Sequence, residues 1–317
     1  MSDLIFVALS TFAQADRSPL DQLEKSGYPF KLHSTGKRIT TSELLKEGGD
    51  AAVILAGVEP YDSATLERLP ALRCISRCGV GVDAIDLGAA GKRGVMVANT
   101  PDIPTEAVAE LAIGTFLGLS RNLRAQTNLM KNRRWERITG HLLEGRTIGL
   151  LGFGRIGRRV AQLCRAFDAE VLACDPLSDE ASAKALGVHL VAREELLSKA
   201  DIISLHASRN VKQPVLIGPE ELAMMKKGAM LVNLARGEMV DENALVEALK
   251  SGHLAGAAMD VFSREPYNGP LCDFEQVILT PHFATLTVET RAAMELQCVQ
   301  NGIQFLEGNL PSQFRVI

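Results

Sequence analysis

The sequence predicts an α/β protein with two doubly wound parallel sheets, and three observations support that prediction. Short apolar runs alternate with helical patterns along the 317 residues, an order that produces parallel strands joined by helices. Hydrophobic residues make up 46% of the chain and aromatic residues 5%, which is typical of an aliphatic globular core. A glycine-rich turn between a predicted strand and a predicted helix is the third observation. The length suits two domains of ordinary size.

The first hundred residues contain five predicted strands with helical patterns between them. The predicted strands are Leu4–Leu9, Tyr28–Leu32, Ala51–Leu55, Arg73–Ser76 and Val95–Ala98. The predicted helices are Leu20–Ser26, Ser42–Glu47, Ser63–Leu69 and Ile85–Lys92. The first apolar run follows Asp3 rather than a basic segment, so we expect a strand there and no signal peptide.

Two prolines, Pro101 and Pro104, interrupt this alternation and mark the expected domain boundary. Thr105 is expected to cap a long helix that continues to about Ser120, because Glu106 and apolar residues at helical spacing follow it. A shorter and more polar helix is expected at Leu123–Asn132.

The glycine-rich turn lies in Ile148–Gly157, where an apolar run precedes three glycines. Gly152, Gly154 and Gly157 have the G-x-G-x-x-G spacing. In that motif the first glycine allows a tight turn, the second lets the backbone approach a pyrophosphate, and the third allows close helix packing. The helix at about Arg155–Phe167 would direct its first N–H groups toward phosphates. The spacing alone also fits a structural turn, but the strand–turn–helix context predicts a dinucleotide-binding Rossmann domain.

The alternation then continues nearly to the end of the chain. Predicted strands are Glu170–Cys174, His189–Val191, Asp201–Leu205, Ala229–Leu234, Gly256–Val261 and Val277–Thr280. Predicted helices are Asp179–Leu186, Arg193–Leu197, Pro219–Met225 and Glu242–Lys250. The last helix, Leu286–Leu306, comes too late for this winding and is expected to return to the first sheet. We therefore predict a Rossmann domain at residues 100–285, inserted in a discontinuous, flavodoxin-like substrate domain at 1–99 and 286–317.

Asp175 directly follows the second strand of the predicted Rossmann domain. A carboxylate there accepts hydrogen bonds from the adenosine ribose hydroxyls and repels a 2′-phosphate, so the sequence favours NAD over NADP. The residues after Pro176 supply no arginine that would reverse this preference. The alternative is an exposed turn aspartate before a proline.

Three polar residues lie just beyond predicted strand ends, where open α/β sheets bind ligands. They are Arg236, Glu265 and His282. Each alone also fits a structural role, as a capping arginine, a surface glutamate or a hydrogen-bonded histidine. Together they suit a 2-hydroxy acid, because histidine can transfer the hydroxyl proton, a carboxylate can orient its ring, and a guanidinium can pair with a substrate carboxylate. With a nicotinamide cofactor, this set predicts interconversion of a 2-hydroxy acid and its 2-keto acid.

Charge, hydropathy and cysteine content exclude several other functions. The formal net charge of −4 gives no reason to expect nucleic acid or a membrane surface as a partner. The apolar runs are too short to span a bilayer. Six scattered cysteines without zinc spacing indicate reduced thiols in a cytoplasmic protein, and we expect no metal. The glycines in Gly79–Asp83 expose backbone N–H groups that could bind a carboxylate, or could form an ordinary turn.

The chain resembles the D-2-hydroxyacid dehydrogenase family over nearly its whole length. The motifs that carry the resemblance are Gly79–Asp83, Thr105–Glu110, Gly152–Gly157, Asn233–Gly237, Asp260–Pro266 and Thr280–His282. The resemblance implies that Arg236, Glu265 and His282 are the catalytic set, and that Asp260 holds the nicotinamide carboxamide. Implied cofactor contacts come from Val80, Val108, Gly152, Gly154, Arg155, Ile156, Gly157, Asp175, His206, Ala207, Leu234, Ala235, Arg236, Asp260 and His282. Implied substrate contacts come from Arg77, Gly79, Val80, Gly81, Arg137, Arg236 and His282. The resemblance also implies a homodimer or a dimer of dimers.

Within the family, the chain is most similar to phosphoglycerate dehydrogenases of the short form, without a regulatory domain. Arg133–Arg137 resembles their Lys-Trp-Glu-Arg stretch, and Arg137 matches the arginine that reaches a substrate phosphate in a neighbouring subunit. Those enzymes also carry an arginine just after the third strand, but this chain has Ala56–Pro60 there, which reads Ala-Gly-Val-Glu-Pro. Lys37 and Arg38 could replace the missing charge, or could form a solvated basic turn.

These observations lead us to expect an NAD-dependent enzyme that interconverts 3-phosphoglycerate and 3-phosphohydroxypyruvate, a reaction of serine biosynthesis. The alternative is reduction of an unphosphorylated acid such as glyoxylate or hydroxypyruvate. A third hypothesis is an NAD-sensing interaction protein, because the family includes a transcriptional corepressor with a retained catalytic set. Formate dehydrogenase is disfavoured, since that branch pairs its histidine with glutamine where this chain has Glu265.

Overall fold

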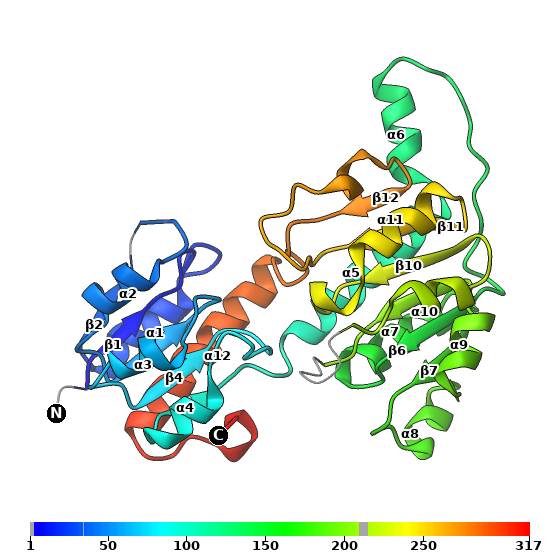
Figure 1. The fold of residues 1–317 in the computed structure, drawn as a ribbon. Coiled ribbons are helices and arrows are strands. Elements are labelled where there is room, and N and C mark those ends of the chain that lie inside the picture. Colours follow the sequence, from blue (N-terminus) through cyan, green and yellow to red (C-terminus); the bar gives the residue numbers. More distant parts are fainter. Residues whose placement is uncertain (1–2, 34, 209–214) are drawn as a thin grey trace. The chain divides into compact units, whose positions relative to one another are not determined.

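The computed structural model describes residues 3–33, 35–208 and 215–317, which form two compact units (Figure 1). Unit 1 comprises Met1–Pro104 and Thr285–Ile317, and unit 2 comprises Thr105–Ala284. In the described residues each unit has one parallel sheet, of five strands in unit 1 and seven strands in unit 2. The predicted α/β class with two parallel-sheet domains is therefore confirmed. The sequence placed the domain boundaries after residues 99 and 285, whereas the units divide after Pro104 and Ala284.

The sheet of unit 1 has the strand order β2-β1-β3-β4-β5, which is the flavodoxin-like order. Its strands are β1 (Ile5–Val7), β2 (Phe30–Leu32), β3 (Val53–Ala56), β4 (Cys74–Arg77) and β5 (Met96–Ala98). Its helices are α1 (Ser18–Ser26), α2 (Thr41–Glu47), α3 (Ser63–Glu67), α4 (Leu87–Lys92) and α12 (Val288–Leu306), with a short 3₁₀ turn η3 (Ser312–Phe314). One face of the sheet is buried under α2, α3 and α4, and the other under α1 and α12.

The C-terminal helix α12 packs on this sheet although it is almost 200 residues from β5. Met294, Cys298 and Ile303 are buried in the same core as the strand residues of β1 and β3. The Ser76 hydroxyl of β4 donates to the carbonyl oxygen of Cys298 at 2.7 Å. Gly302 allows the close approach, because a Cβ there would lie 3.0 Å from Leu55. Unit 1 is therefore built from both ends of the chain.

The sheet of unit 2 has the order β12-β11-β10-β9-β6-β7-β8. Its strands are β6 (Thr147–Leu151), β7 (Glu170–Cys174), β8 (His189–Leu190), β9 (Ile202–Leu205), β10 (Ala229–Asn233), β11 (Leu254–Met259) and β12 (Val277–Leu279). Its helices are α5 (Pro104–Ser120), α6 (Leu123–Lys131), α7 (Arg155–Arg165), α8 (Glu180–Ala185), α9 (Arg193–Lys199), α10 (Pro219–Met224) and α11 (Glu242–Lys250), with 3₁₀ turns η1 (Gly237–Met239) and η2 (Pro270–Asp273). The chain winds outward in both directions from β6, so the neighbours β6 and β9 define the topological switch point.

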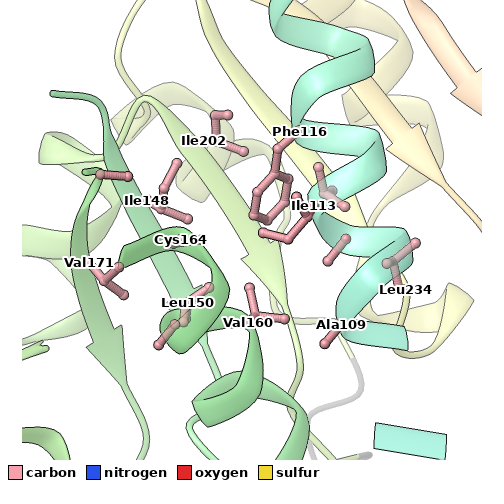
Figure 2. Close-up of a cluster of buried hydrophobic side chains, with 14 of the residues drawn as sticks. Ala109, Ile113, Phe116, Ile148, Leu150, Val160, Cys164, Val171, Ile202 and Leu234 are labelled. Carbon is pink, nitrogen blue, oxygen red and sulfur yellow. The ribbon is translucent and has the colours of Figure 1, made fainter. Parts of the chain in front are cut away.

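The core of unit 2 holds the switch-point strands rigidly. Helices α5, α7 and α8 contribute to the core on one face of the sheet, and α9, α10 and α11 contribute to the core on the other. Figure 2 shows Ile113 and Phe116 of α5 directed toward the strand residues Ile148 and Ile202. Phe116 and Ile148 are fully buried. Strands buried on both faces explain the continuous apolar runs in the sequence.

Several elements differ by a few residues from their predicted bounds, and two of these differences have a clear physical reason. Helix α5 begins at Pro104 rather than after a Thr105 cap, because proline lacks the N–H that the first turn leaves unpaired. Strand β11 covers Leu254–Met259, two residues earlier than predicted, and Leu254 fills the core at its start. Asp260 consequently lies just past the carboxyl end of β11. Across the described segments, no helix combines the length and the apolar character that crossing a membrane requires.

Candidate active site

The glycine-rich turn lies at the carboxyl end of β6, beside the switch point of unit 2. Gly152 has a φ of 102°, and a Cβ there would lie 2.5 Å from the backbone nitrogen of Ala207. A Cβ at Gly157 would lie 2.3 Å from the carbonyl oxygen of Gly152. Gly154, in contrast, has no atom of another described residue within 4 Å of its Cβ position, its chain neighbours aside. Gly152 and Gly157 are therefore required for packing, whereas Gly154 leaves its side of the turn accessible to a ligand.

Helix α7 begins at Arg155, directly after Gly154. Gly154 is the N-cap residue and supplies no side chain to the first N–H groups of this eleven-residue helix. Arg155 is exposed, while Ile156 packs against the core of unit 2. The positive end of the helix dipole and its N–H groups thus face the open side of the turn, an arrangement that suits phosphate oxygens.

Asp175 is fixed beside this turn by two backbone groups. Its Oδ2 accepts a hydrogen bond from the N–H of Phe153 at 2.8 Å, and its Oδ1 accepts one from the N–H of Leu177 at 2.8 Å. Each carboxylate oxygen retains further acceptor capacity. The structure therefore places Asp175 next to the glycine turn with lone pairs available for ribose hydroxyls.

His206 and Ala207 follow β9 on the other side of the switch point. The His206 N–H donates to the carbonyl oxygen of Leu151 at 2.7 Å, which brings this segment against Gly152. His206 Nε2 lies 2.9 Å from the Ser204 hydroxyl. Burial lowers the pKa of His206 to about 4, so its ring is neutral near pH 7. Val108, the other implied cofactor contact here, is buried on α5.

Arg236 is carried by a loop that the buried side chain of Asn233 organises. Asn233 Nδ2 donates to the carbonyl oxygen of Arg236 at 2.8 Å, and its Oδ1 accepts the N–H of Ala235 at 3.0 Å. The Arg236 guanidinium donates to the carbonyl oxygen of Ala235 at 2.7 Å. Sequence reasoning included Asn233 in a motif but missed this role. The available signal was a polar residue ending an otherwise apolar strand.

Gly237 brings the Arg236 loop into direct backbone contact with the loop after β11. A Cβ at Gly237 would lie 1.8 Å from the carbonyl carbon of Phe262. No other residue fits there without moving one loop. Phe262 in turn donates its N–H to Glu265 Oε1 at 3.2 Å. Leu234, the remaining residue of the Arg236 loop, is buried.

His282 and Glu265, which the sequence predicts to act together, lie in contact in unit 2. Nδ1 of His282 lies 3.0 Å from Oε2 of Glu265, and their side chains are 50% and 36% exposed. The backbone of His282 has a φ of 52°, which a residue other than glycine adopts only when its surroundings hold it there. With Nδ1 engaged by the carboxylate, Nε2 is the ring nitrogen that can exchange a proton with a bound molecule.

Asp260 supplies the restraint on the His282 loop. Its buried carboxylate accepts hydrogen bonds from the Thr280 hydroxyl at 2.6 Å and from the N–H groups of Phe283 and Ala284 at 2.9 and 3.0 Å. The His282 N–H donates to the backbone carbonyl of Asp260 at 2.7 Å. The family resemblance implies contact with the nicotinamide carboxamide. The structure shows in addition that this carboxylate is already engaged with the loop that carries the histidine.

In unit 1, Thr100 holds the loop that follows β4. Gly79 has a φ of 136°, and its N–H donates to the Thr100 hydroxyl oxygen at 2.8 Å. The Arg77 guanidinium, which donates to the Cys78 carbonyl, occupies the space where a Gly79 Cβ would lie. The Val80 carbonyl accepts the Asn99 amide at 2.8 Å. The Gly79 N–H is thus engaged, and we expect the N–H groups of Val80 and Gly81 to be those that contact an anion.

The structure therefore gathers part of the predicted set at one edge. Arg236, Glu265 and His282 lie on loops at the carboxyl end of the unit 2 sheet, as do the glycine turn and Asp175. The Gly79–Gly81 loop belongs to unit 1. Arg137 is exposed in the segment after α6, not on a loop that follows a strand. Across the described residues, no three His, Cys, Asp or Glu side chains are grouped so as to bind a metal ion.

Comparison with known proteins identifies the family. The model for the NAD binding domain of D-isomer specific 2-hydroxyacid dehydrogenases matches residues 113–284. The glyoxylate reductase of Korarchaeum cryptofilum is 38% identical over 270 residues, which is 83% of this chain and 81% of that protein. This chain belongs to the D-isomer specific 2-hydroxyacid dehydrogenase family. Unit 2 contains its NAD-binding domain, and the protein is an NAD-dependent D-2-hydroxyacid dehydrogenase.

Other family members differ in their named substrates. The D-3-phosphoglycerate dehydrogenase of Methanocaldococcus jannaschii is 39% identical over 278 residues, which is 86% of this chain. The match covers 53% of that protein, so the chain spans about half its length. The crystal structure of D-lactate dehydrogenase from Aquifex aeolicus with NAD and lactic acid superposes with a TM-score of 0.86 at 28% identity, covering 99% of this chain and 98% of that one. Family membership therefore leaves the choice of acid open.

The contrast between two glycines of the turn gives a first prediction. We expect Gly154→Ala to fold normally but to bind NAD about tenfold or more weakly, because the added methyl enters the side of the turn that phosphates would approach. We expect Gly157→Ala to lose stability, because its Cβ clashes with the Gly152 carbonyl. Calorimetric titration with NAD and thermal unfolding of both variants test this. Unchanged NAD affinity in Gly154→Ala would remove the phosphate role from this turn.

Proposed function

We propose that the protein interconverts 3-phosphoglycerate and 3-phosphohydroxypyruvate with NAD as the hydride carrier. The observation that carries the chemistry is the 3.0 Å contact between His282 Nδ1 and Glu265 Oε2, on loops beside that of Arg236. The similarity of Arg133–Arg137 to the phosphoglycerate dehydrogenase stretch supports a phosphorylated substrate. Relatives with that name support the same choice.

The chain's own groups account for proton transfer and for substrate orientation. NAD, when bound, accepts the hydride from C2 of the hydroxy acid or returns it to the keto acid. In the oxidation, Nε2 of His282 accepts the hydroxyl proton while the C–O bond becomes a carbonyl. Glu265 holds the ring orientation through Nδ1 and stabilises the imidazolium that forms. In unit 2, Arg236 is suited to pair with the carboxylate and carbonyl of the substrate. In unit 1, we propose the N–H groups of Val80 and Gly81 as contacts for a carboxylate.

The residues around the glycine turn fit the cofactor by their chemistry. We assign the phosphates to the backbone at Gly154, Arg155 and Ile156, where the turn is accessible and the helix dipole is positive. Asp175 is assigned to the adenosine ribose. The remaining cofactor contacts are proposed at Val80, Val108, His206, Ala207, Leu234, Ala235, Arg236, Asp260 and His282.

A second candidate is reduction of an unphosphorylated acid such as glyoxylate or hydroxypyruvate. The loop after β3 favours it, because Ala56–Pro60 contains no arginine and its one charged side chain, Glu59, is buried. The glyoxylate reductase of Korarchaeum cryptofilum is also 81% covered by the match. The two candidates share their chemistry and differ in whether the acid carries a phosphate.

The assignment of the proton-transfer group is testable. We expect His282→Ala to lower kcat by about 10² to 10⁴-fold, the usual range for loss of a general acid–base group, while NAD still binds. Arg236→Ala should abolish turnover, and NAD should still bind through the glycine turn and Asp175. His189→Ala, an exposed histidine elsewhere in unit 2, is the control. Full activity of His282→Ala would refute the mechanism.

A substrate panel separates the two candidates. With NADH, we expect kcat/KM for phosphohydroxypyruvate to exceed that for hydroxypyruvate and glyoxylate by about tenfold or more, since a phosphate adds charge-assisted hydrogen bonds. NADPH should support little turnover if Asp175 contacts the ribose. Arg137→Ala should reduce kcat/KM for the phosphorylated acid alone. A wild-type preference for glyoxylate would instead establish the second candidate.

We also propose that the protein is a homodimer that assembles through residues 123–142. We further propose that it is located in the cytoplasm. Several large apolar side chains of this segment are exposed, with Trp135 at 77% and Leu142 at 63%. All six cysteines are unpaired, as in a reducing compartment. We expect Trp135→Asp with Leu142→Asp to convert a dimer into a monomer, measured by light scattering after size exclusion. Leu177→Asp, also in unit 2 and 92% exposed, should leave the mass unchanged. A monomeric wild-type protein would contradict this assembly.

A further inference from the structure

The loops that follow β3 and β4 in unit 1 remain side by side beyond the ends of their strands. Ala56 pairs with Arg77 at the end of the ladder, and the Cys78 N–H donates to the Ala56 carbonyl at 2.9 Å. Farther along, the Tyr61 N–H donates to the Ala84 carbonyl at 2.7 Å. The segment 57–60 and the longer loop that contains Gly79–Gly81 therefore start from one pair of neighbouring strand ends and meet again at Tyr61 and Ala84.

The acidic residue of this segment does not present its charge at the rim of the sheet. Glu59 is only 2% exposed, and its Oε1 accepts hydrogen bonds from the Gly57 N–H at 2.9 Å and from the buried Tyr61 hydroxyl at 2.8 Å. The buried Glu59 carboxylate thus stabilises the turn through these two hydrogen bonds. What the turn offers at the surface is the backbone carbonyl of Val58, whose side chain is also exposed.

A cation from a different part of unit 1 binds that carbonyl. Arg38, which precedes α2, donates from Nη2 to the Val58 carbonyl oxygen at 2.6 Å. Its backbone is well anchored, because the next residue, Ile39, is buried and Thr40 begins α2 with a capping box that Glu43 completes. The guanidinium is therefore held over the segment 57–60 although it lies 20 residues earlier in the chain.

A backbone carbonyl, rather than a carboxylate, holds the Arg38 guanidinium. Within the described ranges, no carboxylate forms an ion pair with its guanidinium, and the bond to Val58 uses one of its five N–H donors. A carbonyl partner fixes the position of the group while leaving its full positive charge. Such a guanidinium, with donors to spare, is suited to the paired oxygens of a phosphate or a carboxylate.

We propose that Arg38 binds the phosphate of the substrate and so takes the place of the arginine that the segment Ala56–Pro60 lacks. The proposal rests on the phosphoglycerate substrate proposed above. The substrate carboxylate at the Val80 and Gly81 N–H groups and the phosphate at Arg38 would lie over neighbouring loops of the same sheet edge. A three-carbon acid with a phosphate on C3 carries its two anionic groups a few bonds apart, as two loops that leave adjacent strand ends require.

The test compares Arg38→Ala with Lys37→Ala, which removes the adjacent exposed cation from the same segment. We expect Arg38→Ala to lower kcat/KM for phosphohydroxypyruvate by about 10- to 100-fold, the range for losing a hydrogen bond to a charged group, with the loss mainly in KM. Its kcat/KM for hydroxypyruvate should stay within twofold. Lys37→Ala should change neither value more than threefold, and Arg38→Lys should recover part of the loss. Thermal unfolding checks that each variant is folded.

The outcomes distinguish this proposal from the substrate proposal beneath it. If the wild type prefers phosphohydroxypyruvate and Arg38→Ala keeps that preference, or lowers both substrates equally, Arg38 does not bind the phosphate and the substrate proposal stands. If the wild type shows no preference for the phosphorylated acid, the substrate proposal fails. The proposed role of Arg38 then fails too, because it requires a phosphorylated substrate. Loss of the preference in Lys37→Ala alone would also overturn the assignment.

Discussion

The buried carboxylate of Asp260 is the interaction on which the geometry of the candidate site depends. It accepts three hydrogen bonds from residues 280–284, and its backbone N–H and C=O bind Asn233 and His282. One residue thereby joins the loops that carry Arg236, Glu265 and His282. A buried carboxylate costs free energy unless its lone pairs are used, so the loop must adopt the conformation that satisfies them. The positive φ of His282 is one consequence of that demand.

The second constraint is the close approach of two backbones at glycine positions, where no Cβ separates them. Gly237 lets the loop after β10 touch the loop after β11, and Gly152 lets the glycine turn touch the segment after β9. These contacts fix distances between loops that side chains alone would leave adjustable. They also show that glycines of one motif differ in purpose, since a Cβ at Gly154 would meet no other atom of the described residues within 4 Å. The loops are therefore closely packed at Gly152 and Gly237, while the turn is open at Gly154.

Much of this fold follows from the period of apolar residues, because parallel strands buried on both faces cannot include polar positions. The residues that follow strands were predictable for a related reason: the carboxyl edge of an open sheet is where ligands bind. That reasoning placed Arg236, Glu265 and His282 on neighbouring loops. It could not assign Asn233, Asp260 or Thr100, whose roles are to satisfy specific backbone groups. Such partners depend on loop conformation, which no periodicity encodes.

The charge on the unit 1 loops is a second property that depends on loop conformation and that the local sequence does not predict. By sequence, the segment Ala56–Pro60 carries an acid and no base, so it argues against an anionic ligand at this place. In the folded unit the carboxylate of Glu59 turns inward to hydrogen-bond Gly57 and Tyr61, while Arg38 bonds to the outer carbonyl of Val58. The sign of the charge presented there is thus the reverse of the sign that the local sequence suggests. The charge that a loop presents therefore depends on where side chains are held as well as on which residues the loop contains.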